Sequence, residues 1–201
     1  MSSRGWQLQA MLALVSSLSG TASIAAGVNL LRNPSFERWH DGAEPAEWSK
    51  GSYPFAWYRD DSRVLIGQYS MRVEGADRYA PIQQVVPGRE DADYVLSWHQ
   101  NPGARTDLRY EWNAHMLDDQ RVALDSVYAQ GALVPGWQRL EATFHTVPLT
   151  AFIRVVVRVL ASGPPFDPHT TWLDGIQLEE GTSATPYDDS ACPSDVWSGK
   201  V

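Results

Sequence analysis

The stretch Leu108–Asn113, LRYEWN, alternates apolar and polar side chains residue by residue. Successive side chains of a β-strand point to opposite faces of a sheet, so this pattern predicts a strand with Leu108, Tyr110 and Trp112 buried. The polar residues between them then share the other face. Alternation of period two, rather than helical spacing, is the dominant pattern from Val28 onward.

The same alternation recurs along the chain. Residues 94–99, YVLSWH, place Tyr94, Leu96 and Trp98 on one face, and residues 152–159 bury Ile153, Val155, Val157 and Val159. Further strands are expected at Asn29–Leu31, Phe36–Trp39, Phe55–Tyr58, Arg63–Ile66, Tyr69–Val73, Ile82–Val86, Val122–Tyr128, Trp137–Phe144 and Thr171–Leu178. Turn residues such as Pro87-Gly88 and Pro135-Gly136 separate them. Many short strands at this spacing predict an all-β sandwich or barrel.

The composition bounds the size and the partners of the protein. Its 201 residues fit one domain, and 43% hydrophobic residues are enough to bury a core. The formal net charge is -8, from 16 basic and 24 acidic residues. This balance argues against sequence-independent binding to nucleic acid or to an anionic membrane, because phosphate contacts need a basic surface. The single cysteine, Cys192, leaves no internal disulfide framework.

The two ends of the chain differ from its middle. Residues 1–26 contain no Asp or Glu and run from Arg4 through an apolar stretch to small residues, which is the order of a signal peptide. The alternative is an N-terminal helix that packs on something else. We therefore expect a secreted, extracellular or cell-surface protein with a β-sandwich over residues 27–188. The last segment, 189–201, is expected to be a tail or a linker to other domains or proteins, and no stretch is apolar and long enough for a membrane span.

A series of short motifs carries a resemblance. The motifs, in order, are residues 29–37 (NLLRNPSFE), 45–48 (PAEW), 67–73 (GQYSMRV), 94–98 (YVLSW), 136–144 (GWQRLEATF), 172–181 (WLDGIQLEEG) and 184–187 (ATPY). Over residues 28–188 the series resembles the carbohydrate-binding modules of the galactose-binding-like jelly-roll type, the grouping around families four, nine, sixteen and twenty-two. The resemblance implies an antiparallel β-sandwich jelly roll. It also implies a carbohydrate-binding function, although the same fold serves in adhesins, surface proteins and phage tails.

Two carboxylates are candidate metal ligands. Glu37 falls on the first predicted strand and Asp174 on the last, and the chain ends of a jelly roll commonly neighbour each other in one sheet. Calcium takes six to eight oxygen ligands, so two acids and loop carbonyls would suffice. The resemblance implies a structural calcium at these positions, with carbonyls from the loop around Gln68. The alternative is that backbone amides satisfy Glu37 and an arginine pairs with Asp174.

The polar face is the candidate ligand site. The predicted outward residues of the central strands include His99, Arg109, Glu111, Asn113 and His115, and we expect Arg154 beside them. Sugar hydroxyls need hydrogen-bonding groups, and the C–H face of a pyranose ring stacks on an aromatic ring. The aromatic run at residues 53–58 offers Trp57 and Tyr58 as platforms.

The resemblance places a groove on the concave face and carries over to Trp57, His99, Arg109 and Glu111. The aromatic residue expected there on the central strands is replaced by Arg109 or His99. The alternative is an ordinary solvated sheet surface.

Together these features predict non-catalytic binding of a polysaccharide or glycan. Hydrolysis would need two converging acids, and Glu111 has no evident partner. One alternative is a structural or adhesive module that contacts other proteins, and a second is a small glycan-cleaving enzyme.

Overall fold

The protein is an antiparallel β-sandwich. A computed structural model describes residues 27–41, 43–51, 55–75, 81–161 and 169–187. Its strands are β1 (Trp39–His40), β2 (Glu44–Pro45), β3 (Ser49–Lys50), β4 (Phe55–Asp60), β5 (Ser70–Gly75), β6 (Ile82–Pro87), β7 (Asp93–Asn101), β8 (Leu108–Leu117), β9 (Ala123–Ala132), β10 (Gln138–His145), β11 (Phe152–Ala161) and β12 (His169–Glu180). The predicted signal peptide (1–26) and tail (189–201) lie outside the described residues. Within the described ranges, no helix is long and apolar enough to cross a membrane.

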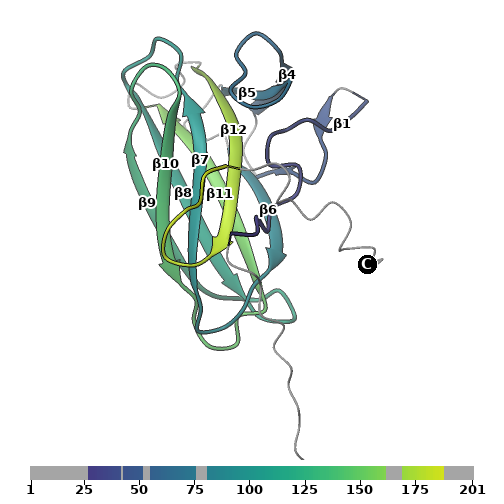
Figure 1. Cartoon of the computed structure of the whole chain (residues 1–201), viewed down its shortest axis with the longest axis vertical. Helices are drawn as coiled ribbons and strands as arrows, with labels where there is room; N and C mark the ends of the chain where they lie inside the picture. Colours follow the sequence, from purple (N-terminus) through teal and green to yellow (C-terminus); the bar gives the residue numbers. More distant parts are fainter. Residues whose placement is uncertain (1–26, 42, 52–54, 76–80, 162–168, 188–201) are drawn as a thin grey trace, which may run out of the picture.

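Two five-stranded sheets form the layers of the sandwich, and in Figure 1 the strands β7, β10 and β12 of one sheet overlap β8, β9 and β11 of the other. The first sheet has the order β10-β7-β12-β5-β4, and the second has the order β3-β6-β11-β8-β9. A small two-stranded ribbon, β1-β2, stands apart from both. Every strand pair is antiparallel, so the predicted sandwich is confirmed.

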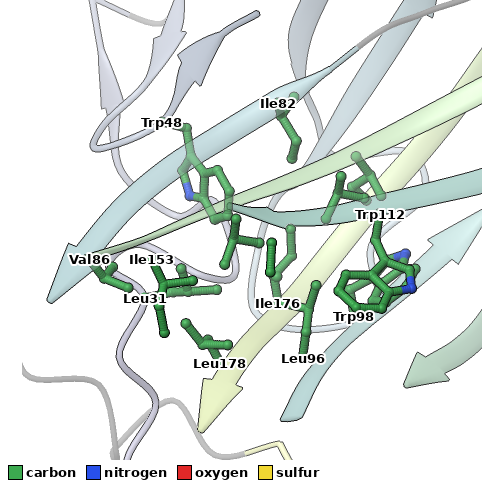
Figure 2. Packing of buried hydrophobic residues seen from close by; sticks show 14 of the residues in the cluster. Leu31, Trp48, Ile82, Val86, Leu96, Trp98, Trp112, Ile153, Ile176 and Leu178 are labelled. Carbon is green, nitrogen blue, oxygen red and sulfur yellow. The ribbon is translucent and has the colours of Figure 1, made fainter. Parts of the chain in front are cut away.

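The core lies between the two sheets and is rich in aromatic rings (Figure 2). Trp98 is fully buried, and its ring meets Tyr110 edge-on with centroids 5.6 Å apart. Phe36 and Trp48 pack against each other at 5.4 Å. The predicted inward sets of β7 and β11 are confirmed, because the following residues are all 0% exposed: Tyr94, Leu96, Trp98, Ile153, Val155, Val157 and Val159.

Three predicted strands are wrong or shortened. Residues 29–31 and 63–66 are not strands, and of Phe36–Trp39 only Trp39 is in one. Between residues 33 and 36 the chain turns instead, with left-handed backbone at Asn33 (φ 49°) and Phe36 (φ 58°). The Asn33 amide holds this turn by donating to the carbonyls of Arg38 and Ala46, at 2.8 and 2.9 Å. Period-two patterns over three or four residues therefore did not outweigh the turn hydrogen bonds.

Candidate functional site

The predicted ligand-site residues lie on two different sheets. Arg109, Glu111, Asn113 and His115 are on β8 and Arg154 is on β11, both in the second sheet. The other three, Trp57, Tyr58 and His99, are on β4 and β7 of the first sheet. The prediction of one continuous face with all eight residues is therefore wrong. Equal parity along two strands does not say in which sheet each strand lies.

Trp57 cannot serve as an open platform. It is 5% exposed, lies opposite Val73 of β5 and packs edge-on against Phe55 with centroids 5.9 Å apart. The Lys50 ammonium lies 4.7 Å from the centroid of its ring. Its neighbour Tyr58 points outward and is 41% exposed. The prediction for Trp57 was wrong because aromatic residues stand next to each other in the stretch 53–58. Without an alternation of apolar and polar residues, the sequence does not show which of two adjacent rings points into the core.

His99 lies on the outer side of the first sheet, which other parts of the chain partly cover. Arg139, its cross-strand neighbour on β10, donates to the Ser97 hydroxyl and to the carbonyl of Thr185. Thr185 also donates its N–H to Glu179 of β12, at 3.0 Å. The segment 181–187 thus lies across β7, β10 and β12. Burial is the main cause that lowers the pKa of His99 from its ordinary value.

The outer face of the second sheet carries the remaining predicted residues. Strand registers place the following side chains there, and we call this set the polar face: Gln83, Val85, Arg109, Glu111, Asn113, His115, Ser126, Tyr128, Gln130, Arg154, Val156 and Arg158. Their neighbours in each strand, such as Trp112 and Val157, point into the core. The prediction that Arg109, Glu111, Asn113, His115 and Arg154 share a face is confirmed by these registers.

An ion pair lies near the middle of the polar face. Arg158 Nη1 lies 2.9 Å from Glu111 Oε1, and these side chains are 22% and 14% exposed. The two residues are direct cross-strand partners. The Asn113 amide donates to the same carboxylate oxygen at 3.1 Å. Glu111 therefore fixes the positions of a guanidinium and an amide that could each meet a ligand.

A second guanidinium on this face has no such partner. Arg154 lies directly across from His115 and forms no hydrogen bond or salt bridge within the described part of the chain. Burial, followed by the positive charges of Arg154 and Arg158, lowers the pKa of His115 from its ordinary value. Near neutral pH, His115 is therefore uncharged and can either donate or accept a hydrogen bond.

Tyr128 supplies an exposed ring that sequence reasoning missed. It lies opposite Asn113 on β9 and is 67% exposed. The stretch 122–128 was predicted as a strand, but nothing in it alone shows that it pairs with β8. The register of the β8–β9 hairpin, closed by the turn at 118–122, puts the tyrosine on the polar face. A ring beside an amide, a carboxylate and a guanidinium is the combination that stacks on and hydrogen-bonds a sugar.

Glu37, Asp174 and Gln68 come together away from this face. Glu37 Oε1 accepts the backbone N–H groups of Gln68 and Tyr69 at 2.9 and 3.0 Å. Asp174 is 0% exposed, and its Oδ2 accepts the N–H groups of Leu65 and Ile66 at 3.1 and 2.9 Å. The loop 65–69 therefore bridges the two acids, although Glu37 lies in the turn before β1 rather than on a strand.

The local backbone explains how Asp174 reaches this loop. The pairing of β12 with β7 shifts between Asp174 and Gln177, and Gly175 has left-handed backbone with φ 53°. A Cβ at Gly175 would collide with the Ile66 side chain, so glycine permits the close approach of the loop. The bulge thus aims the Asp174 carboxylate at the amides of residues 65 and 66.

The Asp174 carboxyl is an unusual acid. Burial, and to a smaller extent the charge of Glu37, raise its pKa to about 7 despite the lowering effect of the backbone amides of Ile66, Leu65 and Gly175. Among the described residues, no lysine, arginine or histidine pairs with Glu37 or Asp174. The alternative in which an arginine pairs with Asp174 is thus wrong. Backbone N–H groups donate hydrogen bonds to both acids. For Glu37 this is the alternative that the sequence analysis gave to a metal ligand.

A cation at this place would depend on the backbone. In the described part of the chain, no three His, Cys, Asp or Glu side chains gather closely enough to hold a metal ion. Two carboxylates without a positive partner fit a hard divalent cation, provided that carbonyl oxygens complete the shell. The Oε2 atom of Glu37 is the carboxylate oxygen that accepts no N–H group from a described residue.

Comparisons with known proteins bear on the fold. No family model and no curated protein matches the sequence. Among solved structures, the CBM22-1 xylan-binding domain from Paenibacillus barcinonensis Xyn10C matches with a TM-score of 0.56 and 15% identity, over 81% of this chain and 100% of that one. The chain has the jelly-roll fold of a carbohydrate-binding module.

Two further structures share this fold. The C-terminal family 22 carbohydrate-binding module of Clostridium thermocellum Xyn10B has a TM-score of 0.56 at 13% identity, covering 79% of this chain and 97% of that module. The enzymatically active domain of bacteriophage CBA120 tailspike protein 4 has a TM-score of 0.60 at 11% identity. The match covers 76% of this chain and 21% of the tailspike chain. The carbohydrate-binding-module fold is thus found both as a whole module and as a part of a larger protein.

Proposed function

We propose that this protein binds a polysaccharide or glycan without cleaving it, and that the polar face of the second sheet is the binding site. The observation that carries the proposal is the exposed Tyr128 ring directly beside Asn113, whose amide is held by Glu111. A sugar ring stacked on Tyr128 would place its hydroxyls within reach of the groups on β8 and β11. Neighbouring structures with the same fold are named as xylan-binding or carbohydrate-binding modules, which supports this assignment.

The polar face favours binding over hydrolysis. Glu111 is the one acid among the outward positions of the described strands in this sheet, and it forms an ion pair with Arg158. Glycoside hydrolysis by two carboxyl groups needs a second acid about 5 to 9 Å away. We therefore assign Glu111 the role of orienting Arg158 and Asn113.

The test compares two tyrosines on opposite sheets. Retardation of the full chain in gels with soluble polysaccharides identifies a ligand, and the assay is then repeated with Tyr128→Ala and the control Tyr58→Ala. The Tyr128 side chain exposes roughly 130 Å², and a sugar ring stacked on one face would cover about half of that area. This contact is worth about 1.5 kcal/mol, so we expect Tyr128→Ala to weaken binding by more than tenfold. Tyr58→Ala should bind normally, because Tyr58 is on the first sheet. Loss of binding in Tyr58→Ala alone would contradict the assignment of the face.

A structural calcium ion is the second part of the proposal. The two carboxylates, one buried and one half-buried, both bind the loop 65–69 and have no positive side chain among the described residues, which supports it. Gln68 would contribute from that loop. A cation there would tie the loop 65–69 to the bulge in β12. The N-terminal sequence pattern leads us to propose, in addition, that the protein acts outside the cell, where calcium is abundant.

The calcium site is tested by its effect on stability. Calcium at about 100 times its dissociation constant would stabilise the fold by about 2.7 kcal/mol, which raises Tm by several degrees. Asp174→Asn should remove this rise, and in the presence of a chelator the variant should be less stable than the wild type, because its NH2 group replaces an oxygen that accepts backbone N–H groups. Equal Tm values of the wild type in calcium and in chelator would refute the site.

One observation favours a different function. Exposed apolar side chains gather on and beside the edge strand β9, namely Val122, Leu124, Tyr128 and Val134. An uncovered edge strand with apolar neighbours can pair with another protein. If light scattering shows a concentration-dependent dimer that Leu124→Lys abolishes, while no polysaccharide retards the chain, the protein-contact function replaces the carbohydrate-binding one.

A further inference from the structure

The charge on the polar face is opposite to that of the whole chain. The protein carries 24 acidic and 16 basic residues. On the outward positions of the described strands of the second sheet, by contrast, three arginines (Arg109, Arg154 and Arg158) accompany one acid, Glu111. A neutral ligand needs no such reversal, whereas an anionic one gains from it.

Two of the three guanidinium groups are free to bind. Glu111 is paired with Arg158 at 2.9 Å, which neutralises that arginine. Arg154 and Arg109 form no salt bridge with any described residue. Arg154 is half-buried, and its Nε is buried without a hydrogen-bond partner among the described residues. Its Nη atoms are not among the buried ones, so an oxyanion from outside can reach them.

The arrangement of the arginines indicates the shape of the ligand. Arg154 and Arg158 are four residues apart on β11, which is roughly 13 Å along a strand. Arg109 lies on the adjacent β8, opposite Leu160, and so continues the series by roughly another 7 Å. The positive groups therefore run along the strands over about 20 Å, which suits a linear chain with repeated charges better than a small ion.

From this geometry we propose that the ligand of the polar face is an anionic polysaccharide, whose carboxylate or sulfate groups bind Arg154 and Arg109 while a sugar ring stacks on Tyr128. The proposal rests on the proposed function and specifies the chemical class of the glycan. A planar guanidinium binds either oxyanion through two parallel hydrogen bonds, so both sources share one chemistry. Solved structures with the same fold are named as xylan-binding or carbohydrate-binding modules, which favours a polysaccharide over a nucleic acid as the polyanion.

The experiment measures affinity for matched pairs of polymers. The full chain is tested against polygalacturonic acid and its carboxyl-reduced form, against dextran sulfate and dextran, and against single-stranded DNA. The variants are Arg154→Gln, Arg109→Gln and, as a control with the same charge change, Arg38→Gln, which alters an exposed arginine in the turn before β1. Because Arg109 is exposed, its variant tests the proposal even if Arg154→Gln impairs folding.

We expect at least tenfold tighter binding to one of the charged polymers than to its uncharged counterpart. Arg154→Gln and Arg109→Gln should each weaken that binding about tenfold, and Arg38→Gln less than twofold. Preference for polygalacturonic acid would identify carboxylate as the recognised group, and preference for dextran sulfate would identify sulfate. Raising the salt from 50 to 500 mM should weaken binding, because exposed charges are screened.

Three results would overturn the proposal, and they differ in what they mean for the proposed function. Equal binding of a charged polymer and its uncharged counterpart, lost in Tyr128→Ala but not in Arg154→Gln, would show a neutral-glycan site. Binding to none of the polysaccharides would refute both the proposed function and its anionic specificity. Binding to DNA as tight as to the polysaccharides would reduce the face to a general polyanion site and would also refute the proposal.

Discussion

Replacement of Glu111 by glutamine should change stability and ligand affinity in opposite directions. The glutamine keeps the shape and one acceptor oxygen but removes the charge that pairs with Arg158 at 2.9 Å. At an effective dielectric constant of about 20, two unit charges at that distance attract by roughly 6 kcal/mol. Desolvation of both groups offsets most of this attraction.

The exposure of the pair sets the expected loss. Exposed pairs contribute up to about 1 kcal/mol, and breaking a fully buried pair costs about 3 to 5 kcal/mol. The side chains of Glu111 and Arg158 are 14% and 22% exposed, so we expect Glu111→Gln to lower the free energy of unfolding by about 2 kcal/mol. For a domain of this size, Tm should fall by about 4 to 8 °C. A matched control is Glu74→Gln, which breaks the more exposed pair with Arg72 and should cost under about 1 kcal/mol.

The same change removes the one acid of the polar face. A negative charge about 7 Å from a bound anion repels it by roughly 0.6 kcal/mol in water, so its loss should tighten the binding of an anionic polysaccharide about threefold. Thermal unfolding followed by circular dichroism measures the first effect, and affinity electrophoresis at low salt measures the second. If Glu111→Gln is no less stable than Glu74→Gln, the stabilising role given to the ion pair is refuted. Weaker binding of the anionic ligand than by the wild type would refute the expected gain in affinity and would show that the orientation of Arg158 and Asn113 by Glu111 outweighs its charge.

Three other changes test the core, the hairpin and the titration of the site. Trp98→Ala should lose about 3 to 5 kcal/mol in urea unfolding, because it empties a fully buried site against Tyr110, and a loss under 1 kcal/mol would contradict that packing. Gly131→Ala should lower Tm, since a Cβ there would lie 2.5 Å from the ring of Tyr110 and overpacking costs about 1 to 3 kcal/mol; an unchanged Tm would show that β9 pairs differently. Because the pKa of His115 is lowered in the folded protein, the unfolded chain takes up the proton more readily, and stability should fall as the pH drops below about 6.5 toward 5. Tm measured at pH 6.5 and at pH 5 should therefore differ less in His115→Gln than in the wild type.

Much of the fold could be predicted from the sequence. Alternation over six to eight residues correctly assigned the buried and outward side chains of β7, β8 and β11, because period two leaves no other way to bury Trp98, Trp112 and Val157 together. The order of motifs correctly predicted the jelly roll. The short pattern at residues 63–66 failed, since a loop that donates its amides to Asp174 competes with strand pairing there.

The sequence by itself determined which side chains share a face within one strand, and so it grouped Arg109, Glu111, Asn113 and His115 correctly. Only the tertiary structure decided which strands are neighbours. It separated His99 from Glu111 by placing β7 and β8 in different sheets, buried Trp57, and brought Tyr128 beside Asn113. The physical reason is that the alternation of side chains between the two faces of a strand is a local property of the backbone. The sheet to which a strand belongs and its register depend on contacts between residues far apart in the chain.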